Sequence, residues 1–251
     1  MTRALGMALA LLALSAARTD AAEIKLLCAG AMRTIVSELG ADFTRETGHT
    51  LALTAGTAGQ LRDKVLAGEP MDVLVVTDTV VDQLIRQGQL APGSRVDLAR
   101  TGMGVAVREG APKPDISTPE ALKQALLSAK SIAYVDPASG GTSGIHFASV
   151  LQRLGIADAV RGKTTLRPGG FVAELVARGE VEMVVHQISE ILPVKGVTLV
   201  GPLPRDLQKV TVYSAALPAR GTTEPAKALV EFLARPALKP KFAAAGLDYK
   251  D

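Results

Sequence analysis

The sequence predicts an α/β protein of two lobes, each with a mixed, mostly parallel sheet, and with a ligand cleft between the lobes. Three observations lead to this prediction. Short apolar segments alternate with segments of helical periodicity, turns of small residues follow the apolar segments, and the pattern restarts near Gly102. Strand–helix–strand units with short connections are typical of parallel sheets that helices cover on both faces.

Residues 1–22 read as a secretory signal, with the basic Arg3, an apolar run at 4–17 and small residues suited to cleavage. The run is shorter than the ~20 residues that span a bilayer. An uncleaved anchor is the alternative. Lipidation at Cys28 is disfavoured because Leu27 stands where a small residue is needed. We therefore expect a periplasmic chain that is soluble after cleavage.

The first lobe is expected to contain residues 23–102 together with residues 208–251, where the chain returns to it. Its elements are predicted from apolar runs, helical spacing and terminating glycines. They are strands at 23–29, 50–55 and 71–76, helices at 34–47, around 61–66 and at 79–87, and, near the end, a strand at 209–217 with helices at 224–234 and 236–245.

The second lobe is expected to span residues 103–207. A Thr-Pro-Glu sequence at 118–120 has a helix-capping residue followed by proline in the first turn, which is typical of a helix start. The predicted strands are 102–108, 131–135, 181–186 and 197–200, and the other predicted helices are 146–154 and 171–178.

The composition excludes several classes of function. The chain has 251 residues, 47% of them hydrophobic, so it is globular rather than disordered. It has no Trp and few Tyr and Phe, which disfavours base stacking, so we expect no nucleic-acid partner. The single Cys allows neither a disulfide framework nor a cysteine zinc site. The mild net charge of +3 suits a small anionic ligand.

Three turns of small residues, at 29–32, 55–59 and 139–144, follow predicted strands and precede predicted helices. Ligands bind at the carboxyl edge of such sheets, and free N–H groups at a helix start attract an anion. Glycine lets the ligand approach the backbone, and Ser or Thr adds hydroxyl donors. The candidate ligand-binding residues are therefore Gly30, Ala31, Met32, Gly56, Thr57, Ala58, Ser139, Gly140, Gly141, Thr142 and Ser143.

Three charged or titratable residues add to this set. His186 ends an apolar strand and is expected to open on the cleft, with capping of the next helix as the alternative. Arg167 or Arg33 could hold a carboxylate in a bidentate fork, unless they are surface arginines. The sequence has no phosphate-binding P-loop, no GxSxG nucleophile motif and no HExxH zinc motif.

Several stretches resemble the periplasmic molybdate-binding proteins of ABC importers, and the resemblance covers essentially all of the chain after the signal. It implies a type II periplasmic binding-protein fold whose lobes close on an oxyanion held by neutral donors. The matching stretches are Ala29-Gly-Ala-Met32, Thr54-Ala-Gly-Thr-Ala-Gly-Gln-Leu61, Gly68-Glu-Pro-Met-Asp-Val73 and Gly179-Glu-Val-Glu-Met-Val-Val-His-Gln187.

The sequence departs from that family at three donor positions. Ala31 stands in place of a serine, Thr57-Ala58 replace serines of the second loop, and His186 replaces a tyrosine. Histidine and arginine suit a carboxylate better than a metal oxyanion. A sister group with the same fold includes aconitate isomerase, an exported enzyme that moves a double bond within a tricarboxylate. Under that alternative His186 is the candidate catalytic base.

The resemblance also implies the partners. We expect a solute-binding protein that passes a molybdate-like oxyanion or an organic carboxylate to the membrane permease of an ABC importer. The isomerase is the alternative. The chain is expected to be a monomer, with no cofactor and no metal site made by its own side chains.

Overall fold

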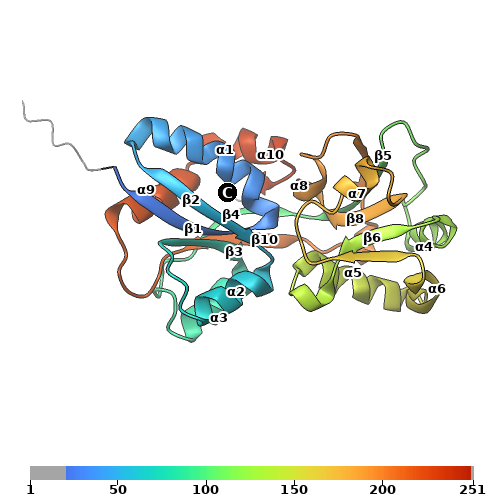
Figure 1. The fold of residues 1–251 in the computed structure, drawn as a ribbon, viewed down its shortest axis with the longest axis horizontal. Coiled ribbons are helices and arrows are strands. Elements are labelled where there is room, and N and C mark those ends of the chain that lie inside the picture. Colours follow the sequence, from blue (N-terminus) through green and yellow to red (C-terminus); the bar gives the residue numbers. More distant parts are fainter. Residues whose placement is uncertain (1–20, 250–251) are drawn as a thin grey trace, which may run out of the picture.

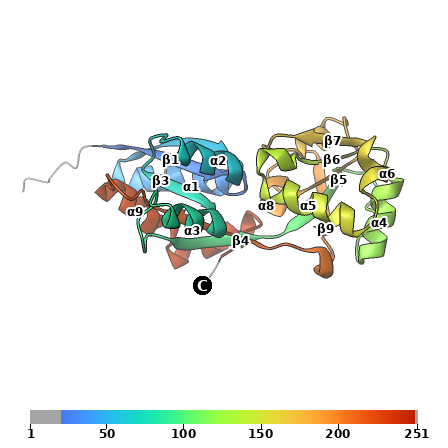
Figure 2. The same cartoon turned by 90° about the horizontal axis from the view of Figure 1, so that it is seen from below.

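A computed structural model describes residues 21–249. The predicted signal, apart from its last two residues, lies outside the described residues. Within them, no helix combines the length and apolar character needed to cross a bilayer. Two α/β lobes lie side by side, and the chain crosses between them twice (Figures 1 and 2).

The first lobe is built on a six-stranded sheet in the order β11-β4-β10-β3-β1-β2. Helices α1, α9 and α10 cover one face, and α2 and α3 cover the other (Figure 1). Its strands are β1 (Glu23–Ala29), β2 (Thr50–Gly56), β3 (Val73–Thr77), β4 (Val96–Thr101), β10 (Thr211–Ala216) and β11 (Asp248–Tyr249). Its helices are α1 (Gly30–Thr47), α2 (Ala58–Leu66), α3 (Asp78–Arg86), α9 (Glu224–Leu233) and α10 (Lys239–Ala244).

The second lobe is built on a five-stranded sheet in the order β7-β6-β8-β5-β9, with an apolar core on each face. Its strands are β5 (Met103–Arg108), β6 (Ile132–Val135), β7 (Thr164–Arg167), β8 (Met183–Gln187) and β9 (Val197–Pro202). Its α-helices are α4 (Pro119–Ser128), α5 (Thr142–Arg153), α6 (Ala157–Arg161), α7 (Glu174–Ala177) and α8 (Ile188–Ile191). We propose that the lobes comprise residues 23–102 with 208–251, and 103–207.

The two-lobe α/β fold with mixed sheets agrees with the sequence-based prediction, but parallel pairing does not dominate. Four of the strand pairs between residues 21 and 249 are parallel and five are antiparallel. The reason lies in strands β5 and β10, which enter their sheets directly from the other lobe. A strand without a crossover helix is free to pair antiparallel, and both do so with each neighbour.

The helices that follow the small-residue turns begin earlier than predicted. Helix α1 starts at Gly30 instead of residue 34, and α5 starts at Thr142 instead of residue 146. The small residues of these first turns show little apolar periodicity, so the sequence pattern does not reveal where the helices begin. The turn residues are therefore helix N-termini, with their N–H groups directed along the helix axis.

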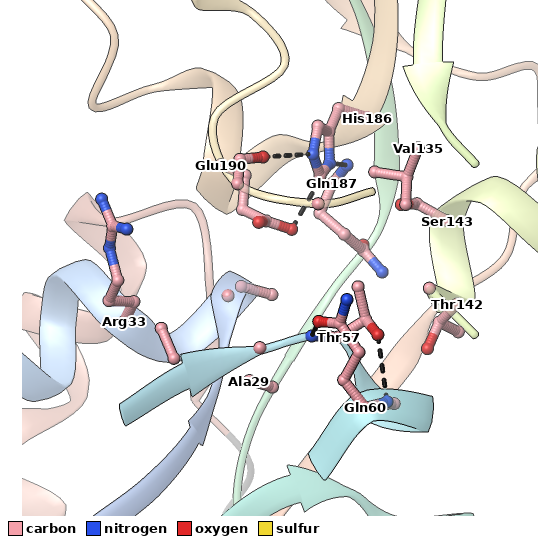
Figure 3. Close-up of a pocket in the computed structure, with 18 of the residues that line it drawn as sticks. Ala29, Arg33, Thr57, Gln60, Val135, Thr142, Ser143, His186, Gln187 and Glu190 are labelled. Carbon is pink, nitrogen blue, oxygen red and sulfur yellow. Dashed lines mark hydrogen bonds and ion pairs between the residues drawn. The ribbon is translucent and has the colours of Figure 1, made fainter. Parts of the chain in front are cut away.

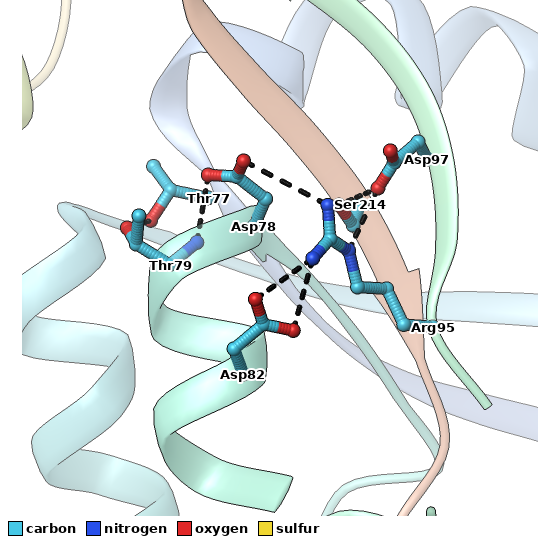
Figure 4. Close-up of polar contacts among 7 residues, drawn as sticks. All are labelled: Thr77, Asp78, Thr79, Asp82, Arg95, Asp97 and Ser214. Carbon is cyan, nitrogen blue, oxygen red and sulfur yellow. Dashed lines mark hydrogen bonds and ion pairs between the residues drawn. The ribbon is translucent and has the colours of Figure 1, made fainter. Parts of the chain in front are cut away.

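A charged cluster holds the surface of the first lobe together (Figure 4). Arg95 Nη1 donates to both carboxylate oxygens of Asp82 of α3, at 2.8 and 2.9 Å, and Nε donates to Asp97 of β4 at 2.8 Å. Asp78 lies 3.7 Å away. Ser214 of β10 donates a hydrogen bond to Asp97 at 2.7 Å. These contacts join one helix to two strands and raise the pKa of Arg95.

Candidate functional site

A cavity of about 290 Å³ lies between the lobes, at the carboxyl ends of β1, β2, β6 and β8. In Figure 3, His186, Gln187 and Glu190 lie on one side of it, and Thr57 and Gln60 lie on the other. Nine of the predicted ligand-binding residues line the cavity: Gly30, Ala31, Gly56, Thr57, Ala58, Gly141, Thr142, Ser143 and His186.

Four predicted site residues do not line the cavity. Met32 is fully buried on the core side of α1. Ser139 and Gly140 contact the other lobe through their carbonyl oxygens, which accept from Thr57 Oγ1 and from the Gly59 N–H. Arg167 is exposed at the end of β7, where its carbonyl accepts the Asp136 N–H at 2.7 Å. Position after a strand therefore does not suffice to place a residue in the cavity.

Two of the helices that begin at the cavity have no side-chain cap. Among the α-helices of ten or more residues in the described chain, α4 and α9 are capped by Thr118 and Thr223. The other two, α1 and α5, start at the cavity, and neither Ala29 nor Gly141 caps them. Free N–H groups and the positive end of the helix dipole thus face the same space from both lobes, which favours an anion there.

Glycines allow the lobes to meet closely at the rim of the cavity. A Cβ at Gly59 would lie 2.7 Å from the Cα of Gly140, so neither position tolerates a larger residue without movement. The Gly59 N–H donates to the Gly140 carbonyl at 3.1 Å. Gln60 Nε2 also donates across the rim, to the Pro168 carbonyl at 3.4 Å. The cleft is therefore closed on this side in the structure.

The cavity contains one arginine and one histidine among its lining residues. The Arg33 guanidinium lies 4.2 Å from the centre of the Phe171 ring, so it joins the two lobes by a cation–π contact. His186 is 1% exposed, and both of its ring nitrogens have partners. Nδ1 accepts the Gln187 N–H at 2.7 Å, and Nε2 lies 3.2 Å from the Gly170 carbonyl, to which it donates its proton.

A carboxyl group, Glu190, also lines the cavity. Its Oε2 lies 3.4 Å from His186 Nδ1 (Figure 3), and burial raises its pKa. Burial also raises the pKa values of Cys28 and of Tyr213, which lines the cavity too, and keeps both neutral. Glu190 is the one carboxyl-bearing residue among the described residues that line the cavity.

Gln187 is a second polar residue of the wall that sequence reasoning missed. Its Nε2 donates to the Thr211 and Tyr213 hydroxyls at 3.4 and 3.3 Å. Its Oε1 is buried and has no hydrogen-bond partner among residues 21–249. An unsatisfied buried amide oxygen costs free energy, so this part of the wall destabilises the fold.

Gln60, Phe171 and Glu190 also line the cavity, and the sequence analysis did not predict them as ligand-binding residues. Arg33, which the sequence analysis considered for binding a carboxylate, lines the cavity too. No local signal marked Glu190, because His186 lies in strand β8, so the spacing of four residues does not place both on one helix face. No group of three or more His, Cys, Asp or Glu suited to a metal ion occurs in the part of the chain that the structure describes.

Comparison with known proteins agrees with this architecture. The family model described as bacterial extracellular solute-binding protein matches residues 24–248, and the chain belongs to this family. An aconitate isomerase of Pseudomonas sp is 34% identical over 218 residues, 84% of this chain and 82% of that protein. The molybdate-binding protein ModA of Azotobacter vinelandii is 28% identical over 233 residues, 89% of this chain and 88% of that protein.

The solved structure of the periplasmic molybdate-binding protein of Azotobacter vinelandii has the same fold. It superposes with a TM-score of 0.73 and 21% identity, over 91% of this chain and 100% of that one. The type II periplasmic binding-protein fold expected from the sequence is therefore the fold of this protein.

Proposed function

We propose that this chain is an exported protein that captures a small organic carboxylate in the cavity between its lobes and delivers it to the permease of an ABC importer. One observation carries the proposal. Helices α1 and α5 begin uncapped at the cavity, which also contains Arg33 and His186. Such a set supplies several directional donors and a full positive charge, as a carboxylate requires.

The size of the cavity and the relatives support this choice of ligand. A cavity of about 290 Å³ is close to the lower end, roughly 300 Å³, of pockets that hold small organic ligands. The first loop offers no hydroxyl group, because Ala31 lines the cavity there. One relative is named for the tricarboxylate aconitate, and another for molybdate.

A thermal-shift screen tests the proposal. The protein without its predicted signal is heated with citrate, cis-aconitate, trans-aconitate, molybdate, tungstate or sulfate. A ligand of the folded state stabilises it by about 2.7 kcal/mol at a hundredfold excess over Kd. We expect the carboxylates to raise the melting temperature. A shift with molybdate or tungstate alone would show that the ligand is a metal oxyanion and would contradict the proposed carboxylate.

Two arginine substitutions test whether the thermal shift depends on this cavity. Arg33→Met should abolish most of the ligand-induced shift, because it removes the cationic donor that lines the cavity. Arg62→Met is the matched control, since Arg62 lies on α2 and pairs with its neighbour Asp63. Equal loss of the shift in both variants would show that the net charge matters rather than the cavity.

The second candidate function is an isomerase that acts on the same ligand. The His186–Glu190 pair in the cavity wall favours it, as does the aconitate isomerase relative. His186 would remove a proton from a carbon next to a carboxylate, and the proton would return to another carbon as the double bond moves. The lone pair that would accept this proton is on Nδ1, because Nε2 donates its own proton to the Gly170 carbonyl. Nδ1 must therefore release the Gln187 N–H before the ring can act as a base.

Proton NMR of cis- and trans-aconitate incubated with the protein in D₂O separates the two candidates. Conversion, with deuterium entering the product, would establish the enzyme. His186→Ala should then stop conversion and keep part of the thermal shift. Binding without conversion in the unmodified protein would exclude the isomerase and leave the transport function.

A further inference from the structure

The carboxyl group of Glu190 lies where α1 begins, across the boundary between the lobes. A Cβ on Gly30 would be 2.5 Å from Glu190 Oε1, so only glycine leaves room for the carboxyl group at this helix start. The Glu190 side chain is 9% exposed. It therefore occupies the end of the cavity where an anion is attracted by the N-terminus of α1.

The hydrogen bonds around Glu190 indicate which atom carries a proton. Because the Gln187 N–H donates to His186 Nδ1, that nitrogen is an acceptor. Its neighbour Glu190 Oε2, 3.4 Å away, therefore receives no hydrogen bond from that nitrogen. An ionised carboxylate can only accept and gains no bond from this neighbour, whereas a carboxylic acid has a hydroxyl to donate to a ligand. In the closed structure the geometry thus favours the protonated form of Glu190.

The other charged groups around Glu190 are few. Arg33 faces it from α1, and His186 faces it from β8. Cys28 of β1 and Tyr213 of β10 also interact with it, and both are neutral. Strand β9 brings no titratable side chain, and Arg108 of β5 lies beside Gly179, away from the cavity. Burial raises the pKa of Glu190 against these partners.

We propose that Glu190 is a ligand-binding residue that contacts the captured anion as a carboxylic acid, so that capture near neutral pH takes up one proton. This inference rests on the proposed function, since it needs an anion in the cavity. In the open protein water reaches Glu190 and it ionises. Closure on an anion places a second negative charge beside it, and the proton that it then binds bridges the two groups.

The proton count can be measured directly by titration calorimetry. Citrate, cis-aconitate and trans-aconitate are titrated at pH 7.5 in buffers of different ionisation enthalpy, and the slope of the binding enthalpy gives the protons taken up. We expect an uptake that approaches one proton. We also expect Kd to rise up to tenfold for each pH unit above the pKa of the open form, as linkage requires.

Glu190→Gln supplies the decisive variant because it keeps the shape of the neutral acid and cannot ionise. It should bind the same carboxylate at least as tightly at pH 7.5, with no proton uptake and a flat dependence of Kd on pH. Glu231→Gln, an exposed residue of α9, is the control and should behave like the unmodified protein. If Glu190→Gln fails to fold, the buffer series on the unmodified protein still shows whether ligand binding takes up a proton.

The outcomes separate this inference from the function on which it rests. Carboxylate binding with no proton uptake would overturn the role of Glu190 and leave the proposed function standing. Uptake that persists in Glu190→Gln would also overturn it and assign the proton elsewhere. If the unmodified protein binds no carboxylate, both the role of Glu190 and the proposed function are contradicted.

Discussion

The Arg95 cluster and the cavity wall both place acidic and basic side chains side by side, but they satisfy them differently. In the Arg95 cluster the guanidinium bonds two carboxylates at 2.8–2.9 Å with a third near, and a serine completes the set (Figure 4). In the cavity wall, Glu190 has one polar neighbour at 3.4 Å, and Gln187 Oε1 has no partner in the described chain.

This difference distinguishes a structural cluster from a binding site. Paired charges at short distances hold elements together and leave nothing for a ligand. Groups that are buried yet incompletely bonded cost stability. Such a cost is expected where a ligand supplies the missing partners, because strained and unsatisfied groups concentrate at functional sites.

The largest expected effect is on stability, from Arg95→Met. Removing the guanidinium leaves Asp78, Asp82 and Asp97 to repel one another, and we expect the free energy of unfolding to fall by about 2 kcal/mol. Urea denaturation measures it. Ligand-induced stabilisation should stay unchanged, because Arg95 does not line the cavity. A loss of ligand binding in this variant would contradict the view that the Arg95 cluster is structural and separate from the binding site.

A smaller effect, on binding, is expected from Gly59→Ala. The new methyl group would meet Gly140 Cα at 2.7 Å only when the lobes are closed, so it opposes closure without disturbing either core. We expect Kd for the carboxylate to rise about tenfold, or about 1.4 kcal/mol, with little change in the melting temperature of the free protein. Gly162→Ala is the control, because its Cβ would meet nothing within 4 Å.

The smallest effect is the pH dependence of stability due to Glu190. Its pKa is raised in the closed folded protein, where it is buried, so the closed protein binds more protons than the unfolded chain between the two pKa values. Stability must fall as pH rises through that window, which begins near pH 4.5, the ordinary pKa of a glutamic acid. Glu190→Gln should lack this fall. Melting curves from pH 4 to 8 test it, and parallel curves for both proteins would contradict it.

Much of the fold could be predicted because strands and helices were visible as apolar patterns. The core strands β1, β3 and β8 each contain a run of buried apolar residues. In contrast, β4, β7 and α6 were missed, since they are short and carry polar or exposed residues. The two strands depend on their neighbours in the sheet rather than on their own sequence, and the five-residue helix is too short to show a periodic pattern.

The cavity residues that were predicted are backbone-rich turns, and those that were missed act through side chains. Gly30, Thr57 and Ser143 follow strands, and a parallel sheet brings strand ends to one edge whatever their sequence. Gln187 ends strand β8 and Glu190 follows it, yet nothing in their local sequence tells which way their side chains point. Arg167 was predicted as a ligand-binding residue, and its side chain is exposed and does not line the cavity.

The sequence by itself determined the alternation of strands and helices, the small residues at the helix starts and the absence of the catalytic motifs sought. These are local properties, which depend on periodicity and on the conformations each residue allows. Only the tertiary structure decided that Gly30 receives the carboxyl group of Glu190 and that Gly59 meets Gly140. Those contacts join residues far apart in the chain, and they form because the packing of two lobes fixes distances that no local pattern encodes.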